Sequence, residues 1–182
     1  MIKATETKLK GCFIIEPTIF EDERGYFFES YNHRGFCEAI GQEVNFVQDN
    51  QSFSKKGVLR GLHFQKGEHA QAKLVSVLSG KIQDVAVDLR KDSPTFGQHL
   101  SIDLSSKNKK QLFVPRGFAH GFLTLSDAAK VLYKCDNNYS PMAEGGIRFD
   151  CRELNIKWLT HLDYLLLSKK DKNLPNYLEP LT

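Results

Sequence analysis

The run that decides the fold reads Gly57-Val58-Leu59-Arg60-Gly61-Leu62-His63-Phe64-Gln65 and is followed closely by Lys73. Apolar and polar residues alternate around His63, which is typical of a strand with one buried face. Leu62 and Phe64 are therefore expected on one face of this strand and His63 on the other. Lys73 begins the next predicted strand, so this cation lies either at the rim of a sheet or inside a site. We expect His63 and Lys73 to meet in one pocket, as a base and an electrophile.

Outside this run, short apolar segments recur from residue 58 to residue 131, separated by glycine, proline, asparagine and serine. Short strands at such regular intervals predict an all-β sandwich or barrel. One short helix is predicted over residues 32–40, ended by Gly41. The aromatic segment at residues 26–31 predicts a further strand.

The composition limits the classes of function. A chain of 182 residues predicts a single domain over residues 1–182. The net charge of +3 and the lack of a long basic run argue against nucleic-acid binding, and no apolar segment is long enough to cross a membrane. The cysteines show no CxxC spacing, so we interpret them as free thiols of a cytoplasmic protein. They are Cys12, Cys37, Cys135 and Cys151.

Two histidines are candidates for chemistry. A histidine in an apolar strand is more often a core residue with a satisfied hydrogen bond than a catalyst, and His63 alone would not decide between the two. Arg60 and Lys73 favour a functional role, because buried cations need an anionic partner or ligand. His120 lies between Gly117 and Gly121. Glycines at these positions indicate that the backbone approaches another group closely, with an ordinary turn as the alternative.

A catalytic metal is the obvious competing interpretation, because histidines and a carboxylate suit a transition metal. Here the position two residues after His63 is Gln65, whose amide is a poor ligand, and the cation Lys73 stands where a carboxylate might complete the set. We therefore expect no metal and no cofactor, and activity that survives chelation.

Short motifs of one known enzyme family occur along nearly the whole chain, in that family's order. They are Asp22 to Phe27, Gln48 to Ser52, Leu59 to Gln65, His69 to Val75, Asp84 to Arg90, Ser93 to Gly97, Pro115 to Phe122, Leu132 to Lys134 and Ser168 to Asp171. On these runs the chain resembles the dTDP-4-dehydrorhamnose 3,5-epimerases, and two of its elements resemble the cupin motifs.

The resemblance implies a fold, a partner and a reaction. The fold is a cupin-type double-stranded β-helix, or jelly-roll barrel, with a few short helices, and the expected assembly is a homodimer. The implied enzyme is an isomerase of dTDP-L-rhamnose biosynthesis, which supplies lipopolysaccharide or cell-wall polysaccharide. It converts dTDP-4-dehydro-6-deoxy-D-glucose to dTDP-4-dehydro-L-rhamnose by inverting carbons 3 and 5. The alternatives are a single-carbon epimerase or a ketoisomerase on a related nucleotide sugar, and a cupin that binds such a sugar without catalysis.

The resemblance also implies catalytic roles. His63 is the base, Asp171 orients it, Lys73 stabilises the enolate and Tyr133 is the acid that protonates the opposite face. Asp84 is a second acid that could orient the histidine, and the sequence alone leaves both carboxylates open.

The substrate-binding residues follow from the same resemblance. Cations suit a pyrophosphate, and Tyr139 matches an aromatic that stacks on the thymine ring. The full set is Arg24, Glu29, Gln48, Asp49, Asn50, Arg60, Lys73, His120, Tyr139, Glu144 and Lys170. The chain departs from the family pattern at Lys66-Gly67-Glu68, Asn137-Asn138-Tyr139 and Gly145-Gly146, and the last two put the nucleotide preference in doubt.

Overall fold

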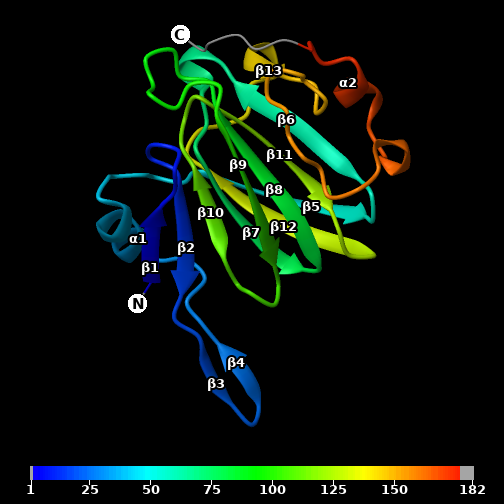
Figure 1. The fold of residues 1–182 in the computed structure, drawn as a ribbon. Coiled ribbons are helices and arrows are strands. Elements are labelled where there is room, and N and C mark those ends of the chain that lie inside the picture. Colours follow the sequence, from blue (N-terminus) through cyan, green and yellow to red (C-terminus); the bar gives the residue numbers. More distant parts are fainter. Residues whose placement is uncertain (1, 177–182) are drawn as a thin grey trace.

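The computed structural model describes residues 2–176 and consists mainly of strands arranged in two facing sheets (Figure 1). The larger sheet contains, in spatial order, β1 (Ile2–Glu6), β2 (Phe13–Pro17), β10 (Gln111–Val114), β7 (Lys73–Ser79), β12 (Ala128–Cys135) and β5 (Gln48–Lys55). The smaller sheet contains β13 (Glu144–Gly146), β6 (Leu59–Gln65), β11 (Phe118–Thr124), β8 (Lys81–Asp88) and β9 (His99–Ser105). The predicted all-β, cupin-type fold is confirmed.

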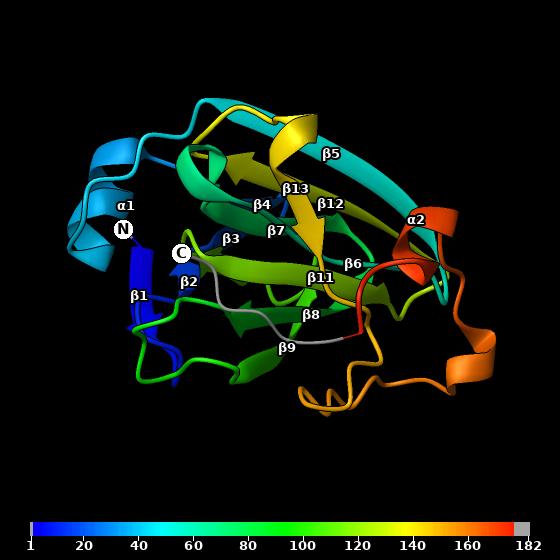
Figure 2. The same cartoon turned by 90° about the horizontal axis from the view of Figure 1, so that it is seen from above.

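The remaining elements lie around these sheets. A separate hairpin of β3 (Phe20–Asp22) and β4 (Gly25–Phe27) projects away from the body of the molecule (Figure 1). The helices α1 (His33–Ile40) and α2 (Lys169–Lys172) lie at opposite ends of the molecule (Figure 2). Short 3₁₀ turns cover Gly67–His69, Pro141–Ala143 and Leu162–Tyr164.

The main apolar core fills part of the space between the two sheets. Val75 and Val131 from the larger sheet pack there with Ile82, Ala86 and Phe122 from the smaller sheet, all buried. The core does not continue to the end of the sandwich where β6, β7 and β12 carry polar side chains on their inner faces. This interruption of the core leaves room for a cavity between the sheets.

A second cluster covers the outer face of the smaller sheet. Leu62 and Phe64 of β6 pack there with Phe149 and Trp158 from the C-terminal segment. Because these two side chains point outward, His63 between them points inward, as the alternation predicted. The long segment after β13 therefore shields the back of the strand that carries His63.

The predicted helix over residues 32–40 is confirmed as α1. The side chain of Asn32 accepts a hydrogen bond from the backbone N–H of Gly35 at 3.0 Å, which caps the start of the helix. Gly41 ends it in the left-handed conformation with φ of 69°. Phe36 and Ile40 pack on the outer face of the larger sheet.

The predicted strand over residues 26–31 is wrong beyond Phe27, where β4 ends. Tyr31 instead turns toward α1, and its ring lies 5.7 Å from that of Phe36 and 5.4 Å from that of Phe46, between ring centroids. Aromatic residues favour strands and also favour clusters of aromatic rings, and here the cluster determines the backbone.

All four cysteines are free and buried, in agreement with the interpretation as thiols. Among the described residues, no helix combines the length and the apolar character that a membrane crossing requires.

Candidate active site

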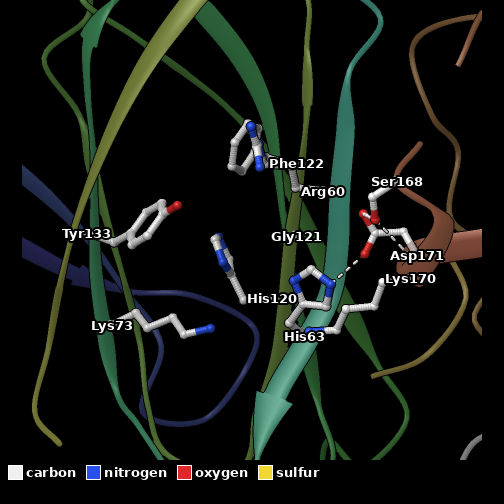
Figure 3. Close-up of a pocket in the computed structure, with 10 residues that line it drawn as sticks. All are labelled: Arg60, His63, Lys73, His120, Gly121, Phe122, Tyr133, Ser168, Lys170 and Asp171. Carbon is white, nitrogen blue, oxygen red and sulfur yellow. Dashed lines mark hydrogen bonds and ion pairs between the residues drawn. The ribbon is translucent and has the colours of Figure 1, made fainter. Parts of the chain in front are cut away.

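A cavity of about 300 Å³ lies between the two sheets and opens into an adjoining space of about 610 Å³. Arg60, His63, Lys73 and Tyr133 line both, so the two form one continuous site. The inner part is lined by Arg60, His63, Lys73, His120, Gly121, Phe122, Tyr133, Ser168, Lys170 and Asp171. Figure 3 shows Tyr133 and Lys73 extending from one side of this cavity and His63 from the other.

The opposition of these side chains follows from the sheets that carry them. His63 lies on β6 in the smaller sheet, with His120 of β11 as its direct partner in the strand register. Lys73 on β7 and Tyr133 on β12 belong to the larger sheet. A ligand between the sheets therefore meets the imidazole on one side and the phenol on the other.

Two glycines allow β6 and β11 to come this close. A Cβ atom on Gly121 would lie 2.6 Å from the carbonyl oxygen of Arg60, and one on Gly61 would lie 2.7 Å from Cα of Gly121. Gly61 also has φ of 120°, which favours glycine. The predicted close backbone approach near His120 is thus an approach to β6.

His63 is held by a carboxylate from α2. Its Nε2 lies 2.6 Å from Oδ1 of Asp171, and the hydroxyl of Ser168 donates to Oδ2 of Asp171 at 2.8 Å. Burial acts to raise the pKa of Asp171, but the hydrogen bond and charge of His63, with Ser168 and Lys170, outweigh it, so the pKa is lowered. The carboxylate is therefore ionised at neutral pH and accepts the Nε2 hydrogen, which leaves Nδ1 of His63 as the basic nitrogen.

Asp84, the other carboxylate considered from sequence, does not reach His63. Its Oδ1 lies 2.8 Å from Nε2 of His120, and both side chains are buried. Its Oδ2 has no hydrogen-bond partner among the described residues. The structure thus separates two histidine–carboxylate pairs, with Asp171 on His63 and Asp84 on His120.

Lys73 is a cation in a site that disfavours its charge. Burial lowers the pKa of its ammonium group, while the charges of Cys135, Asp84 and Glu144 act weakly in the opposite direction. A lysine with a lowered pKa gives up a proton more readily than a free lysine, and a desolvated ammonium interacts more strongly with a nearby oxyanion.

The outer part of the site is ordered by a polar network. Glu144 forms an ion pair with Lys170 and accepts a hydrogen bond from the hydroxyl of Tyr139 at 3.0 Å. The backbone N–H of Tyr139 donates to Gln48 at 2.9 Å, and Gln48 donates to Asn50 at 3.0 Å. The ring of Tyr139 is half exposed at the mouth of the site.

Three of the predicted substrate-binding residues do not line this cavity. Arg24 lies in the β3–β4 hairpin and pairs with Asp22, and Glu29 is exposed and accepts a hydrogen bond from Asn32. Asp49 pairs with Lys134 at 3.1 Å. Gln48 and Asn50 point into the site, so the alternation along β5 turns Asp49 to the other face.

Sequence reasoning missed several lining residues. Gln65, discounted as a metal ligand, is buried and holds the loop of Tyr139, because its amide accepts from the N–H of Ser140 at 2.6 Å and donates to the carbonyl of Asn138 at 3.3 Å. The alternation from His120 could have identified Phe122. The spacing of Ser168 and Asp171 is that of a helix N-cap and could have identified the serine that holds the carboxylate.

The arrangement as a whole suits proton transfer at carbon next to a carbonyl group. It combines an oriented base, a cation for a developing oxyanion and a phenol on the opposite side. Arg60 and Lys170 add positive charge to the lining of the cavity, which suits an anionic ligand.

Comparison with known proteins agrees with this chemistry. The family described as dTDP-4-dehydrorhamnose 3,5-epimerase matches residues 6–179. The enzyme of that name from Salmonella typhimurium is 56% identical over 158 residues, covering 87% of this chain and 86% of its own length. The crystal structure of the Elizabethkingia anophelis enzyme is 56% identical with a TM-score of 0.92, covering 96% of this chain and 95% of its own.

A further solved structure contains a ligand. The Legionella pneumophila dTDP-6-deoxy-D-glucose-3,5-epimerase, in complex with dTDP-4-keto-L-rhamnose, is 46% identical with a TM-score of 0.92. The match covers 96% of this chain and 92% of that one.

Proposed function

The chain belongs to the dTDP-4-dehydrorhamnose 3,5-epimerase family and is an isomerase, and on this premise we propose that His63, Lys73 and Tyr133 carry out its proton transfers. The reaction inverts carbons 3 and 5 of dTDP-4-dehydro-6-deoxy-D-glucose and yields dTDP-4-dehydro-L-rhamnose. The observation that carries the proposal is that a base and an acid enter one cavity from opposite sheets.

The proposed mechanism starts with proton removal next to the carbon-4 ketone. Nδ1 of His63 takes the proton, and the ionised Asp171 stabilises the imidazolium that forms. The electron pair moves into an enolate, whose oxygen is stabilised by the ammonium group of Lys73. Tyr133 then donates its phenolic proton to the same carbon from the other side, and the configuration is inverted.

Substrate binding is assigned to the outer part of the site. Arg60 and Lys170 would neutralise the pyrophosphate, and Tyr139 would stack on the thymine ring. Side chains supply the base, the acid and the oxyanion partner, so the proposal includes no metal or cofactor. It also includes a cytoplasmic location, since a reducing compartment maintains free thiols such as the four buried here.

The Tyr133→Phe variant tests the division of labour between the two faces. It should still remove substrate protons, because His63 and Lys73 are intact, but inverted product should fall about a hundredfold or more. Proton NMR in heavy water would follow exchange and inversion in one sample. Misfolding would depress both signals together, so a folded variant in which exchange falls as far as inversion would remove Tyr133 from the role of acid.

A homodimer is the second part of the proposal, and the β3–β4 hairpin supports it. Phe20, Tyr26 and Phe27 are exposed by 60%, 58% and 71% on a hairpin that projects from the body. Exposed aromatic groups on a short unpaired hairpin suit contact with a second copy. Arg24 on the same hairpin would then contact substrate in the partner's cavity, which explains why it is remote from its own.

Sedimentation velocity tests the dimer. We expect the wild type to sediment as a dimer and a Tyr26→Ser, Phe27→Ser double variant to shift toward monomer with an unchanged circular dichroism spectrum. The matched control is Tyr164→Ser, which removes an aromatic side chain that is 72% exposed outside the hairpin. A monomeric wild type at working concentration would contradict the proposal.

A further inference from the structure

Three potential metal ligands that the proposed reaction does not use meet beside α1. Nε2 of His33 lies 3.8 Å from Sγ of Cys37 and 3.0 Å from Oε1 of Glu43. The three ligand atoms all lie within 4.8 Å of one another. Helix α1 is at the opposite end of the molecule from α2, which carries Asp171 (Figure 2). The cluster is therefore separate from the cavity.

Local structure brings these residues together. His33 and Cys37 are four residues apart on α1, so they lie on one face in successive turns. Gly41 ends the helix in the left-handed conformation, and the chain folds back so that Glu43 reaches the first turn. Helix geometry fixes two of the ligands relative to each other, and the helix cap positions the third.

The sulfur atom has surroundings that suit a metal-bound thiolate. Cys37 is only 8% exposed, and the backbone N–H of Val44 donates to its Sγ at 3.4 Å. Such a hydrogen bond orients a sulfur ligand. The side chains of His33 and Glu43 are 47% and 75% exposed, so the other two ligands face solvent, from which an ion could enter.

The distances from Nε2 of His33 to the other two ligand atoms are close to those between ligands around a tetrahedral ion. Zinc bonds of about 2.3 Å to sulfur and about 2.0–2.2 Å to nitrogen and oxygen place neighbouring ligands roughly 3.4–3.6 Å apart. The observed 3.8 Å and 3.0 Å lie on either side of this range and need only small side-chain rotations to reach it. A thiolate, an imidazole and a carboxylate form a donor set that suits Zn²⁺ better than Mg²⁺ or Ca²⁺.

We propose that His33, Cys37 and Glu43 bind one Zn²⁺ ion, with water in the fourth position. On binding, the thiol of Cys37 releases its proton to solvent and the sulfur bonds to the metal, while neutral His33 binds through Nε2. The ion links the first turn of α1 to the segment after it. It therefore stabilises the folded chain, by a free energy that rises with the logarithm of the free Zn²⁺ concentration above Kd.

Cobalt(II) is the probe, because a cobalt–thiolate bond gives a charge-transfer absorption and tetrahedral cobalt gives intense visible bands. Chelator-treated full-length protein, kept reduced with a thiol-free reductant, is titrated with Co²⁺ and then with Zn²⁺. We expect saturation at one Co²⁺ per chain, displacement by Zn²⁺ and a higher melting temperature with Zn²⁺. Absence of a saturable thiolate band would overturn the proposal.

Substitutions test each ligand. Cys37→Ser should abolish the charge-transfer band, and Glu43→Gln, at an exposed position that cannot affect folding much, should weaken Co²⁺ binding by about tenfold or more. The matched controls are Cys151→Ser and His161→Gln, which should bind Co²⁺ like the wild type. A thiolate band of full strength in Cys37→Ser, or unchanged affinity in Glu43→Gln, would contradict the assignment. Epimerase activity should survive chelation, because the cluster is separate from the cavity. A loss of activity that Zn²⁺ restores would indicate a metal ion in the active site and contradict the assignment.

Discussion

The His63→Ala variant is expected to lose both inversion and exchange of the substrate's protons with solvent, each by about 10³- to 10⁴-fold. Exchange requires the enolate, and the enolate forms only when a base removes the proton. His120 is not expected to take over, because it is held by the buried Asp84 at 2.8 Å and its side chain is only 6% exposed, whereas that of His63 is 30% exposed. Proton NMR of the substrate in heavy water measures both quantities.

The control for this variant must separate lost chemistry from lost structure. His69→Ala removes an imidazole that is 45% exposed and lies outside the cavity, and it should retain full activity. Binding of dTDP to His63→Ala should stay within a few fold of the wild type, because the nucleotide contacts are elsewhere. Continued exchange in a folded His63→Ala protein would show that another group is the base.

The Lys73→Met variant is expected to lose activity by about 10²- to 10³-fold, the usual effect of removing one oxyanion-stabilising group. The reduction should be in kcat rather than KM if the ammonium group acts on the enolate and not on the ground-state ketone. Steady-state kinetics separates these constants. An unchanged kcat would remove Lys73 from the mechanism.

The same substitution should make the protein more stable at neutral pH. Burial lowers the pKa of Lys73, which means that folding disfavours its charged form. Burying the charged form therefore lowers the free energy of unfolding. This destabilisation is complete below the pKa of Lys73 in the folded protein and disappears as the pH rises toward its pKa in the unfolded chain, about 10.4. The melting temperature of Lys73→Met should therefore exceed that of the wild type at pH 7, with a gap that narrows in alkaline buffer.

Much of the site could be predicted because it depends on strand alternation. His63 between Leu62 and Phe64 had to face away from the apolar cluster that those two residues join, and the structure agrees. The same rule applied to Gln48, Asp49 and Asn50 would have turned Asp49 away from the cavity. The family resemblance predicted all three as substrate-binding residues. The alternation of side chains along a strand separates Asp49, on one face, from the other two.

Other features depend on contacts between distant parts of the chain. The choice between Asp171 and Asp84 as the partner of His63 is decided by the packing of α2 against β6, which local pattern does not encode. Tyr31 does not continue the predicted aromatic strand, because its ring packs against the rings of Phe36 and Phe46. The role of Gln65 depends on a loop more than seventy residues later.

Two of the predicted substrate contacts lie outside the cavity. Arg24 and Glu29 carry the chemistry expected of substrate contacts, yet the hairpin that bears Arg24 points away from the cavity between the sheets. Neither alternation nor composition could reveal that separation, because it depends on the direction in which a short hairpin leaves the body. The dimer proposal accounts for the distance of Arg24 from its own cavity, because the β3–β4 hairpin would contact the second copy.

Deuterium incorporation from heavy water tests the central claim most directly. Wild-type protein is incubated with dTDP-4-dehydro-6-deoxy-D-glucose in heavy water beside His63→Ala, and carbons 3 and 5 are followed by NMR. The two-face mechanism predicts deuterium at both carbons of the inverted product with the wild type, and at neither carbon with His63→Ala. Label at only one carbon, or equal labelling by the two proteins, would contradict it.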